Sequence, residues 1–136
     1  NAEFIMDGEK IQGRERYLIA VTAILHDIGM INAKEKYGQT GGPYQEKEGP
    51  AAAKALLVGE DFGEDEIDRI CYIIGNHHTP SKIDGVDFQV LWEADVLEAL
   101  KKIDKESNQD KLQVLITKNF KTKTGVQLAE SMLIVR

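Results

Sequence analysis

The sequence predicts an all-α fold, a compact helical bundle, and three observations support this prediction. The 136 residues suit one hydrophobic core. Hydrophobic residues make up 42% of the chain and charged residues 29%, which is ordinary globular composition and argues against disorder. Apolar residues recur at spacings of three and four, whereas patterns typical of strands are nearly absent. We therefore expect residues 1–136 to form a single domain of unequal helices.

Two helices are expected in the first half of the chain. The first covers Arg14–Asp27, where apolar residues step by three and four, and Gly29 marks its end. The second begins at Gly49 and Pro50, because proline is favoured in the first turn of a helix, and it continues to Val58.

The segment between these two helices, Gly29–Lys47, shows little periodicity and contains four glycines. Connections longer than about 12–15 residues without regular structure are usually functional lids or disordered segments. Tyr37, Tyr44 and Gln45 could cover a site from such a segment. We therefore expect a lid here.

Two further helices are expected in the middle of the chain. Glu64 opens an acid-rich first turn, which the helix dipole favours, and Pro80 ends this helix. Its apolar stripe continues onto His77 and His78. The next helix runs from about residue 88 to residue 103, after a turn.

Two shorter helices are expected near the end of the sequence. Ser107 is suited to cap a helix over Asp110–Lys118. Thr124 and Gln127 have the spacing of a capping box, which predicts a last helix through Val135.

Charge and composition narrow the class of partner. The net charge is −6, from 17 basic and 23 acidic residues, and two short lysine clusters are interpreted as solvated surface, so long nucleic acid is not an expected partner. No apolar run approaches the about 20 residues that span a bilayer, so no membrane partner is expected. The single cysteine, Cys71, is interpreted as packing in a protein of the reducing cytoplasm.

The three histidines all lie at predicted helix ends. His26 and Asp27 close the first helix, and His77 and His78 close the third. A buried imidazole needs a partner, and two interpretations remain open: hydrogen-bonded core histidines or metal ligands.

Asp95 lies among apolar neighbours on the fourth predicted helix, where Glu93 and Glu98 are interpreted as ordinary exposed residues. Aspartate is almost never buried without a partner, so Asp95 is either a solvated residue or a ligand. The His-Asp, His-His and Asp features fall on three helices and can converge only inside a bundle. Mixed imidazole and carboxylate ligands suit Fe, Mn, Co, Ni or Zn rather than Ca.

Three stretches resemble a known family. Residues 25–29 (LHDIG) resemble the signature of the HD-domain superfamily of metal-dependent phosphohydrolases. Residues 76–79 (NHHT) are similar to the second histidine pair of its dinuclear members, and residues 93–97 (EADVL) to its closing aspartate motif. The resemblance spans roughly residues 2–100. It implies an all-α hydrolase that cleaves a phosphomonoester or a nucleotide or dinucleotide phosphate through a metal-activated water.

The resemblance also implies roles for individual residues. One or two divalent transition metals are expected, with Fe or Mn preferred and Co, Ni, Zn or Mg as alternatives. Asp27 would bridge two ions and act as the catalytic carboxylate, and Lys82 would contact a phosphate oxygen unless it is a plain surface lysine. The implied metal ligands are His26, Asp27, Glu48, His77, His78 and Asp95.

Two departures from the family pattern leave alternatives open. Glu48 stands where dinuclear members carry a histidine, so it is either a ligand or an acid favoured by the helix dipole. The family's first metal histidine would fall before Asn1. The alternatives to an enzyme are an HD-type regulatory or ligand-binding module with reduced catalysis, and a plain helical interaction domain without metal. The expected partner is a small phosphorylated molecule.

Overall fold

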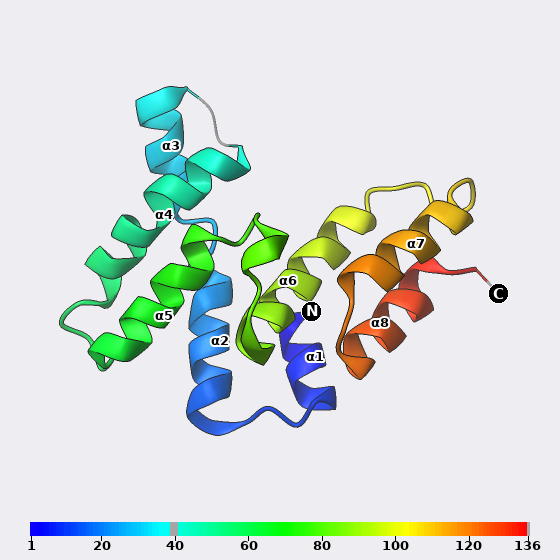
Figure 1. Ribbon diagram of the computed structural model, residues 1–136, viewed down its shortest axis with the longest axis horizontal. Helices are drawn as coiled ribbons and strands as arrows, with labels where there is room; N and C mark the ends of the chain where they lie inside the picture. Colours follow the sequence, from blue (N-terminus) through cyan, green and yellow to red (C-terminus); the bar gives the residue numbers. More distant parts are fainter. Residues whose placement is uncertain (39–40, 136) are drawn as a thin grey trace. The chain divides into compact units, whose positions relative to one another are not determined.

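The computed structural model describes residues 1–38 and 41–135, and every regular element in these ranges is helical (Figure 1). The chain divides into two compact units, which are described separately. The terminal unit comprises Asn1–Tyr17 and Gly85–Arg136, and the central unit comprises Leu18–Asp84. The predicted all-α class is therefore confirmed. Among the described residues, no helix has the length and apolar character that a membrane span requires.

Four helices build the terminal unit. They are α1 (Ala2–Gly8), α6 (Gly85–Leu100), α7 (Gln109–Asn119) and α8 (Lys123–Leu133). Helix α6 contacts the other three, and the buried core is Leu97, Leu100, Leu112, Ile116, Phe120, Ala129 and Leu133. Sequence analysis did not anticipate α1, because a seven-residue helix is too short to show a periodic apolar pattern.

The predicted boundaries of α6 and α7 need small corrections. Helix α6 begins and ends three residues before its predicted limits of 88 and 103, because Gly85, at φ 79°, takes the turn that precedes it. Helix α7 lies within one residue of its prediction, but Asn108 is its N-cap residue. Ser107 instead donates its hydroxyl hydrogen to Asp104 Oδ2 at 2.7 Å, so the predicted cap was wrong.

Helix α8 begins at a different cap from the one predicted. Thr122 is the N-cap residue, and its hydroxyl oxygen accepts a hydrogen bond from Gly125 N at 2.9 Å. The predicted capping box at Thr124 and Gln127 was therefore wrong by two positions. The backbone N–H of Thr124 instead donates to Glu9 Oε2 at 3.0 Å, and its hydroxyl donates to the same oxygen.

The central unit contains α2 (Gly13–Leu25), which begins in the terminal unit, then α3 (Gly29–Tyr37), α4 (Gly42–Leu57), α5 (Glu64–Gly75) and a short 3₁₀ helix, η1 (Pro80–Lys82). Helix α4 contacts both α3 and α5 (Figure 1). The buried core of the central unit is Ala53, Leu57, Ile67, Ile70 and Ile74. The partly buried residues packed against this core are Leu18, Val21, Leu25, Ile28, Phe62 and Cys71. The packing role of Cys71 is confirmed, and its thiol donates to Pro50 O at 3.4 Å.

The predicted lid over Gly29–Lys47 was wrong, because most of this segment is helical. Helix α3 begins at Gly29, and α4 begins at Gly42 rather than at Gly49, so Pro50 lies inside a helix. Residues 39 and 40 lie outside the described residues. A Cβ atom on Gly29 would lie 2.5 Å from Gly49 N and 2.6 Å from Gln45 O, so these glycines allow two helix backbones to touch. Sequence reasoning took glycine as a helix breaker where it serves close packing.

The histidine-bearing ends also differ from the prediction. Helix α2 stops at Leu25 and α5 stops at Gly75, so the His26-Asp27 and His77-His78 pairs lie in the turns that follow. His77 is nevertheless buried, as the continuation of the apolar stripe predicted, whereas His78 is exposed. Asn76 ends α5, and its side-chain amide donates to Tyr72 O at 2.7 Å.

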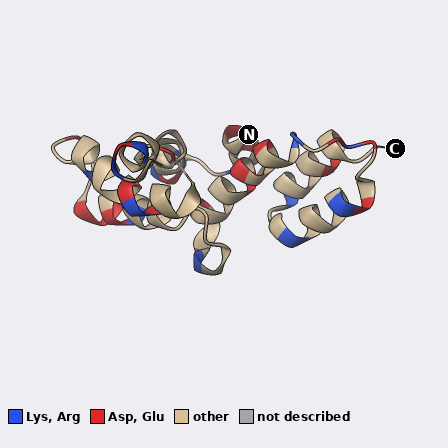
Figure 2. Cartoon of the chain, turned by 90° about the horizontal axis from the view of Figure 1, so that it is seen from above, with Lys and Arg blue, Asp and Glu red and all other residues tan. Residues whose placement is uncertain are grey.

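Figure 2 shows that basic and acidic residues are interspersed on the helices of both units. The six lysines of the two short clusters are all exposed, which confirms that they are surface residues. They are Lys101, Lys102, Lys105, Lys118, Lys121 and Lys123.

Candidate metal centre

One face of α4 packs against the turn that follows α5. The residues on this face are Gly42, Gln45, Glu46 and Gly49, at the spacing that places side chains on one side of a helix. A Cβ atom on Gly42 would lie 2.9 Å from His78 Cγ, and one on Gly49 would lie 2.6 Å from Ile74 Cγ2. The glycines of α4 therefore bring its backbone into direct contact with the His78 ring and the end of α5.

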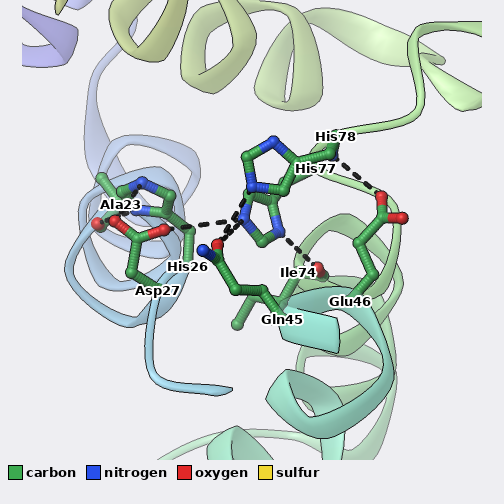
Figure 3. Close-up of polar contacts among 8 residues, drawn as sticks. All are labelled: Ala23, His26, Asp27, Gln45, Glu46, Ile74, His77 and His78. Atoms are coloured by element: carbon green, nitrogen blue, oxygen red, sulfur yellow. Dashed lines mark hydrogen bonds and ion pairs between the residues drawn. The ribbon is translucent and has the colours of Figure 1, made fainter. Parts of the chain in front are cut away.

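Three side chains converge at the open ends of α2 and α5 (Figure 3). One potential ligand atom from each of Asp27, His77 and His78 lies within 4.8 Å of the other two. His77 Nε2 is 3.6 Å from Asp27 Oδ1, and the centroids of the His77 and His78 rings are 4.1 Å apart. His77 is only 3% exposed, whereas the Asp27 side chain is 49% exposed. The group thus has a buried side and a side open to solvent.

Backbone carbonyls fix the orientation of two imidazole rings in the same way. His77 Nδ1 lies 2.6 Å from Ile74 O, and His26 Nδ1 lies 2.6 Å from Ala23 O. A carbonyl oxygen only accepts hydrogen bonds, so Nδ1 carries the hydrogen in both rings. In the neutral imidazole the lone pair is then on Nε2. A metal-binding histidine commonly has this arrangement, with one nitrogen on the ion and the other donating to a carbonyl.

Asp27 lies between the two oriented rings. His26 Nε2 is 3.1 Å from Asp27 Oδ2, on the opposite oxygen from the one that faces His77. A proton or cation shared across these contacts stabilises the carboxylate form. The contact with His26, followed by that with His77, holds the pKa of Asp27 well below its usual range, although partial burial opposes the shift. Asp27 is therefore an anion at neutral pH.

Gln45 contributes an oxygen atom to the same group, which sequence analysis did not foresee. Its Oε1 lies 3.0 Å from His78 Nε2 and 3.2 Å from His77 Nε2 (Figure 3). The sequence had pointed to Gln45 only as part of a lid. Recognition of α4 as a helix from Gly42 would have placed Gln45 on the face that packs against the histidines.

Glu46, the next residue of α4, holds the turn that carries His78. Its Oε2 accepts a hydrogen bond from His78 N at 2.9 Å, and its carboxylate also accepts one from the Thr79 hydroxyl. This residue was also missed, because both contacts cross 32 or 33 positions of sequence. Glu46 positions the backbone of His78 while Gln45 meets its ring.

Glu48, the acid predicted as a ligand, is paired with α3. Its Oε1 lies 3.1 Å from Lys36 Nζ, and its Oε2 accepts a hydrogen bond from the Tyr37 hydroxyl at 3.2 Å. Glu48 is 9% exposed and does not belong to the group formed by Asp27 and the two histidines. Its role as a metal ligand stays a prediction.

The donor set fits a divalent transition metal. It combines the imidazole nitrogens of His77, whose ring is oriented by Ile74 O, and of His78 with an ionised carboxylate and an amide oxygen, and it contains no thiolate. Such nitrogen and oxygen ligands suit Fe, Mn, Co, Ni and Zn. Asp27, His77 and His78, together with the neighbouring His26, could hold the ion directly.

Comparison with protein-family models matches residues 4–119 to the HD domain. The chain belongs to the HD domain family. No curated protein and no solved structure matches it. The match includes all three stretches on which the resemblance was based, and HD domains bind divalent metals, in agreement with the group around Asp27.

Besides His26 and Glu48, two further predicted residues of this HD domain are not among the three residues Asp27, His77 and His78. Asp95 lies on α6 in the terminal unit and is partly buried. Lys82 ends η1 and is exposed, and its carbonyl oxygen accepts a hydrogen bond from the Tyr72 hydroxyl at 2.9 Å. The predicted roles of Asp95 as a ligand and of Lys82 as a phosphate contact stay predictions.

Glu93 was wrongly interpreted as an exposed residue, whereas Glu98 is exposed as expected. The Glu93 side chain is 0% exposed. Its Oε2 accepts hydrogen bonds from Gln89 Nε2 at 2.6 Å, Lys121 N at 2.7 Å and Thr122 N at 3.0 Å. Its Oε1 accepts one from the Thr122 hydroxyl at 2.6 Å. These donors explain how a carboxyl group can be buried without a metal.

Proposed function

We propose that this HD domain protein is a metal-dependent phosphohydrolase that cleaves a phosphomonoester or a nucleotide or dinucleotide phosphate. The observation that carries the proposal is the convergence of Asp27, His77 and His78. Because the Asp27 side chain is half exposed, a phosphate oxygen could reach an ion held there. The single cysteine, Cys71, fits the reducing cytoplasm as the compartment of this activity.

In the proposed reaction, Asp27, His77 and His78 would hold iron or manganese, and His26, Glu48 and Asp95 are the further ligands that the family pattern suggests. A bound divalent ion supplies a water of lowered pKa and positive charge for the phosphate oxygens. The ionised Asp27 carboxylate accepts a hydrogen bond from the attacking water and orients it.

Other residues prepare the site or the substrate in this proposal. His26 Nε2 lies 3.1 Å from Asp27 Oδ2, and when it is protonated it would donate to that oxygen and hold the carboxylate in place. Lys82 Nζ would contact a phosphate oxygen, since η1 carries it only four residues after His78.

Elemental analysis and a phosphate-release screen test this function together. We expect purified protein to carry iron or manganese and to release phosphate from a nucleoside mono-, di- or polyphosphate, a dinucleotide or an aryl phosphate. The Asp27→Ala variant should lose this activity. Absence of metal from the protein, with no thermal stabilisation by added Mn, Fe, Co, Ni or Zn, would contradict the proposal. So would turnover that survives the Asp27→Ala substitution.

A regulatory or ligand-binding HD module with reduced catalysis is the second candidate. The contacts of Glu48 favour it, because Lys36 and Tyr37 occupy both oxygens of the acid that would otherwise be a ligand for a second ion. Metal occupancy and saturable nucleotide binding, without turnover of any phosphate ester in the screen, would support this module over the enzyme.

A further inference from the structure

We propose that copies of this protein associate head to tail, with Val114 on α7 of one copy seated in a surface pocket where α4 and α5 of the next copy meet. Lysines flank Val114 on its helix, and acidic residues border the pocket. The proposal concerns a docking surface and does not depend on metal binding or catalysis at Asp27.

The first surface is the pocket, which lies where α4 ends and α5 begins and has a volume of about 310 Å³. Val58, Phe62 and Ile67 give it an apolar lining, and Val58 is 58% exposed. Glu64 and Asp68, both exposed and one helical turn apart, also line it. The pocket therefore suits an apolar side chain that has positive charge beside it.

Acidic residues dominate the stretch of chain that forms this pocket. Residues 54–68 contain six acids and a single lysine, Lys54, which also lines the pocket. The negative charges outnumber this one positive charge, so the electrostatic potential at the pocket attracts a cationic partner.

The second surface is one face of α7. Lys111, Val114 and Lys118 follow one another at spacings of four residues or fewer, which places them on the same side of the helix. All three are exposed, and Val114 is 65% exposed. Leu112 and Ile116 of the same helix are buried in the core, so the face that carries Val114 is turned to solvent.

The charge around this face is opposite to that of the pocket. Residues 101–123 contain seven lysines and three acids. A single exposed valine is ordinary on a protein surface, but Val114 with a lysine on either side matches the pocket in both apolar character and charge. Charge complementarity of this kind steers two surfaces together and disfavours other partners.

The two surfaces differ from each other, so their association is heterologous. An exposed apolar residue that fits a pocket elsewhere on the same protein joins copies head to tail, into rings or open chains. A second copy is the occupant because this chain itself carries both complementary surfaces.

Sedimentation velocity of the full chain over a series of protein concentrations tests the proposal, at about 0.05 M and at about 0.5 M salt. One variant carries Lys111→Gln together with Lys118→Gln, which changes only the α7 face. The other variant carries Asp68→Lys, which changes only the pocket.

We expect the original chain to associate as its concentration rises, with a dissociation constant at least about tenfold higher at the higher salt, because salt screens exposed charges. Each variant alone should stay monomeric over the range in which the original chain associates. A mixture of the two variants should form a dimer with one copy of each and nothing larger. The first variant keeps an intact pocket and the second keeps an intact α7 face, whereas the two altered surfaces have no opposite charges to bring them together.

Matched controls make the same changes of charge at exposed positions outside both surfaces. They are Lys10→Gln with Lys34→Gln, and Glu35→Lys, and each should associate as the original chain does. Circular dichroism checks that every variant is folded. Val114→Ser replaces the first variant and Val58→Ser the second if either does not fold, since each removes the apolar contact from its surface.

Monomers at every concentration would overturn the proposal, including the case in which a different protein covers the pocket. Association that either variant leaves unchanged would also overturn it, because the interface would then lie elsewhere. If each variant lost association but their mixture stayed monomeric, the two surfaces would not meet each other, and the head-to-tail arrangement would be wrong.

Discussion

Two carboxyl groups, one in each unit, show how differently an acid can be used in this fold. Glu93 of the terminal unit is 0% exposed, and its two oxygens accept four hydrogen bonds from protein donors. Asp27 of the central unit is half exposed and faces two imidazole nitrogens. The Glu93 carboxyl group is thus fully hydrogen-bonded by protein donors. The Asp27 carboxylate instead faces imidazole nitrogens, and a proton or a metal ion between these atoms would stabilise it.

The difference in hydrogen-bond partners indicates that Glu93 stabilises the fold, whereas Asp27 is suited to bind a metal ion. A buried carboxylate is costly unless donors surround it, and Glu93 has them because it joins α6 to the backbone that precedes α8. Among the residues that the structure describes, no backbone N–H group donates to the Asp27 carboxylate, and the histidines beside it already give their Nδ1 hydrogens to carbonyl oxygens. Removal of Glu93 should therefore cost stability, and removal of Asp27 should cost metal binding.

The largest expected effect is that of Glu93→Ala on folding. The substitution leaves the N–H groups of Lys121 and Thr122, the second of them buried, without an acceptor and opens a cavity, so we expect a loss of about 3–5 kcal/mol in the free energy of unfolding. Urea denaturation measures it. Glu98→Ala on the same helix is the control and should change stability by no more than about 0.5 kcal/mol, because Glu98 is exposed. Equal effects of the two substitutions would contradict the structural role.

The second prediction is that Asp27→Asn affects metal binding more than folding. We expect metal affinity to fall by at least about tenfold, which corresponds to about 1.4 kcal/mol of binding free energy, while the metal-free protein still folds and loses less stability than Glu93→Ala does. Chelator competition and thermal denaturation without metal measure the two quantities.

Cys71→Ala is the matched control for this second prediction, because it should do the opposite. The thiol packs against the central core, so its loss should cost about 1 kcal/mol of stability and leave metal affinity unchanged. If Cys71→Ala released the metal and Asp27→Asn did not, the division of this unit into core and site would be wrong.

The sequence was enough to find Asp27 but not Glu93 or Gln45, and the reasons are physical. Asp27 belongs to a local motif with its histidine, whereas the donors to Glu93 lie 28 and 29 positions away and leave no local pattern. Gln45 was missed because the glycines around it were taken as signs of a loop. Gly29 and Gly49 instead let α3 and α4 approach closely, and this need is visible only once the two helices are seen together.

The helix class and most helix positions were predictable because they depend on local apolar periodicity. The stripe of α5 at Ile67, Ile70 and Ile74 is buried as its spacing predicted. Helix ends were less predictable, since caps depend on single hydrogen bonds. Thr122 and Thr124 are chemically alike, and only the partners Gly125 and Glu9 decide which of them caps α8.

The smallest expected effect concerns Glu9, an acid that lies between the two extremes because Thr124 donates two hydrogen bonds to one of its oxygens near the surface. The side-chain and backbone hydrogen bonds from Thr124 hold the pKa of Glu9 below its ordinary value of 4.5, with burial opposing the shift. The folded state therefore favours the ionised form. Its contribution to stability is complete above the ordinary pKa and is lost as the pH falls through the lowered one.

Thr124→Val tests this third case, because it removes the hydroxyl donor and keeps the shape of the side chain. We expect the variant to be less stable than the original chain at pH 7, and the difference to shrink as the pH is lowered below 4.5, where Glu9 takes up a proton in both proteins. Urea denaturation at a series of pH values measures it, with Thr117→Val on the exposed surface of α7 as the control. A difference that stays constant across this range would mean that the hydroxyl acts through packing. In that case the Thr124 hydroxyl would not stabilise the ionised form of Glu9, and Glu9 would not be intermediate between Glu93 and Asp27.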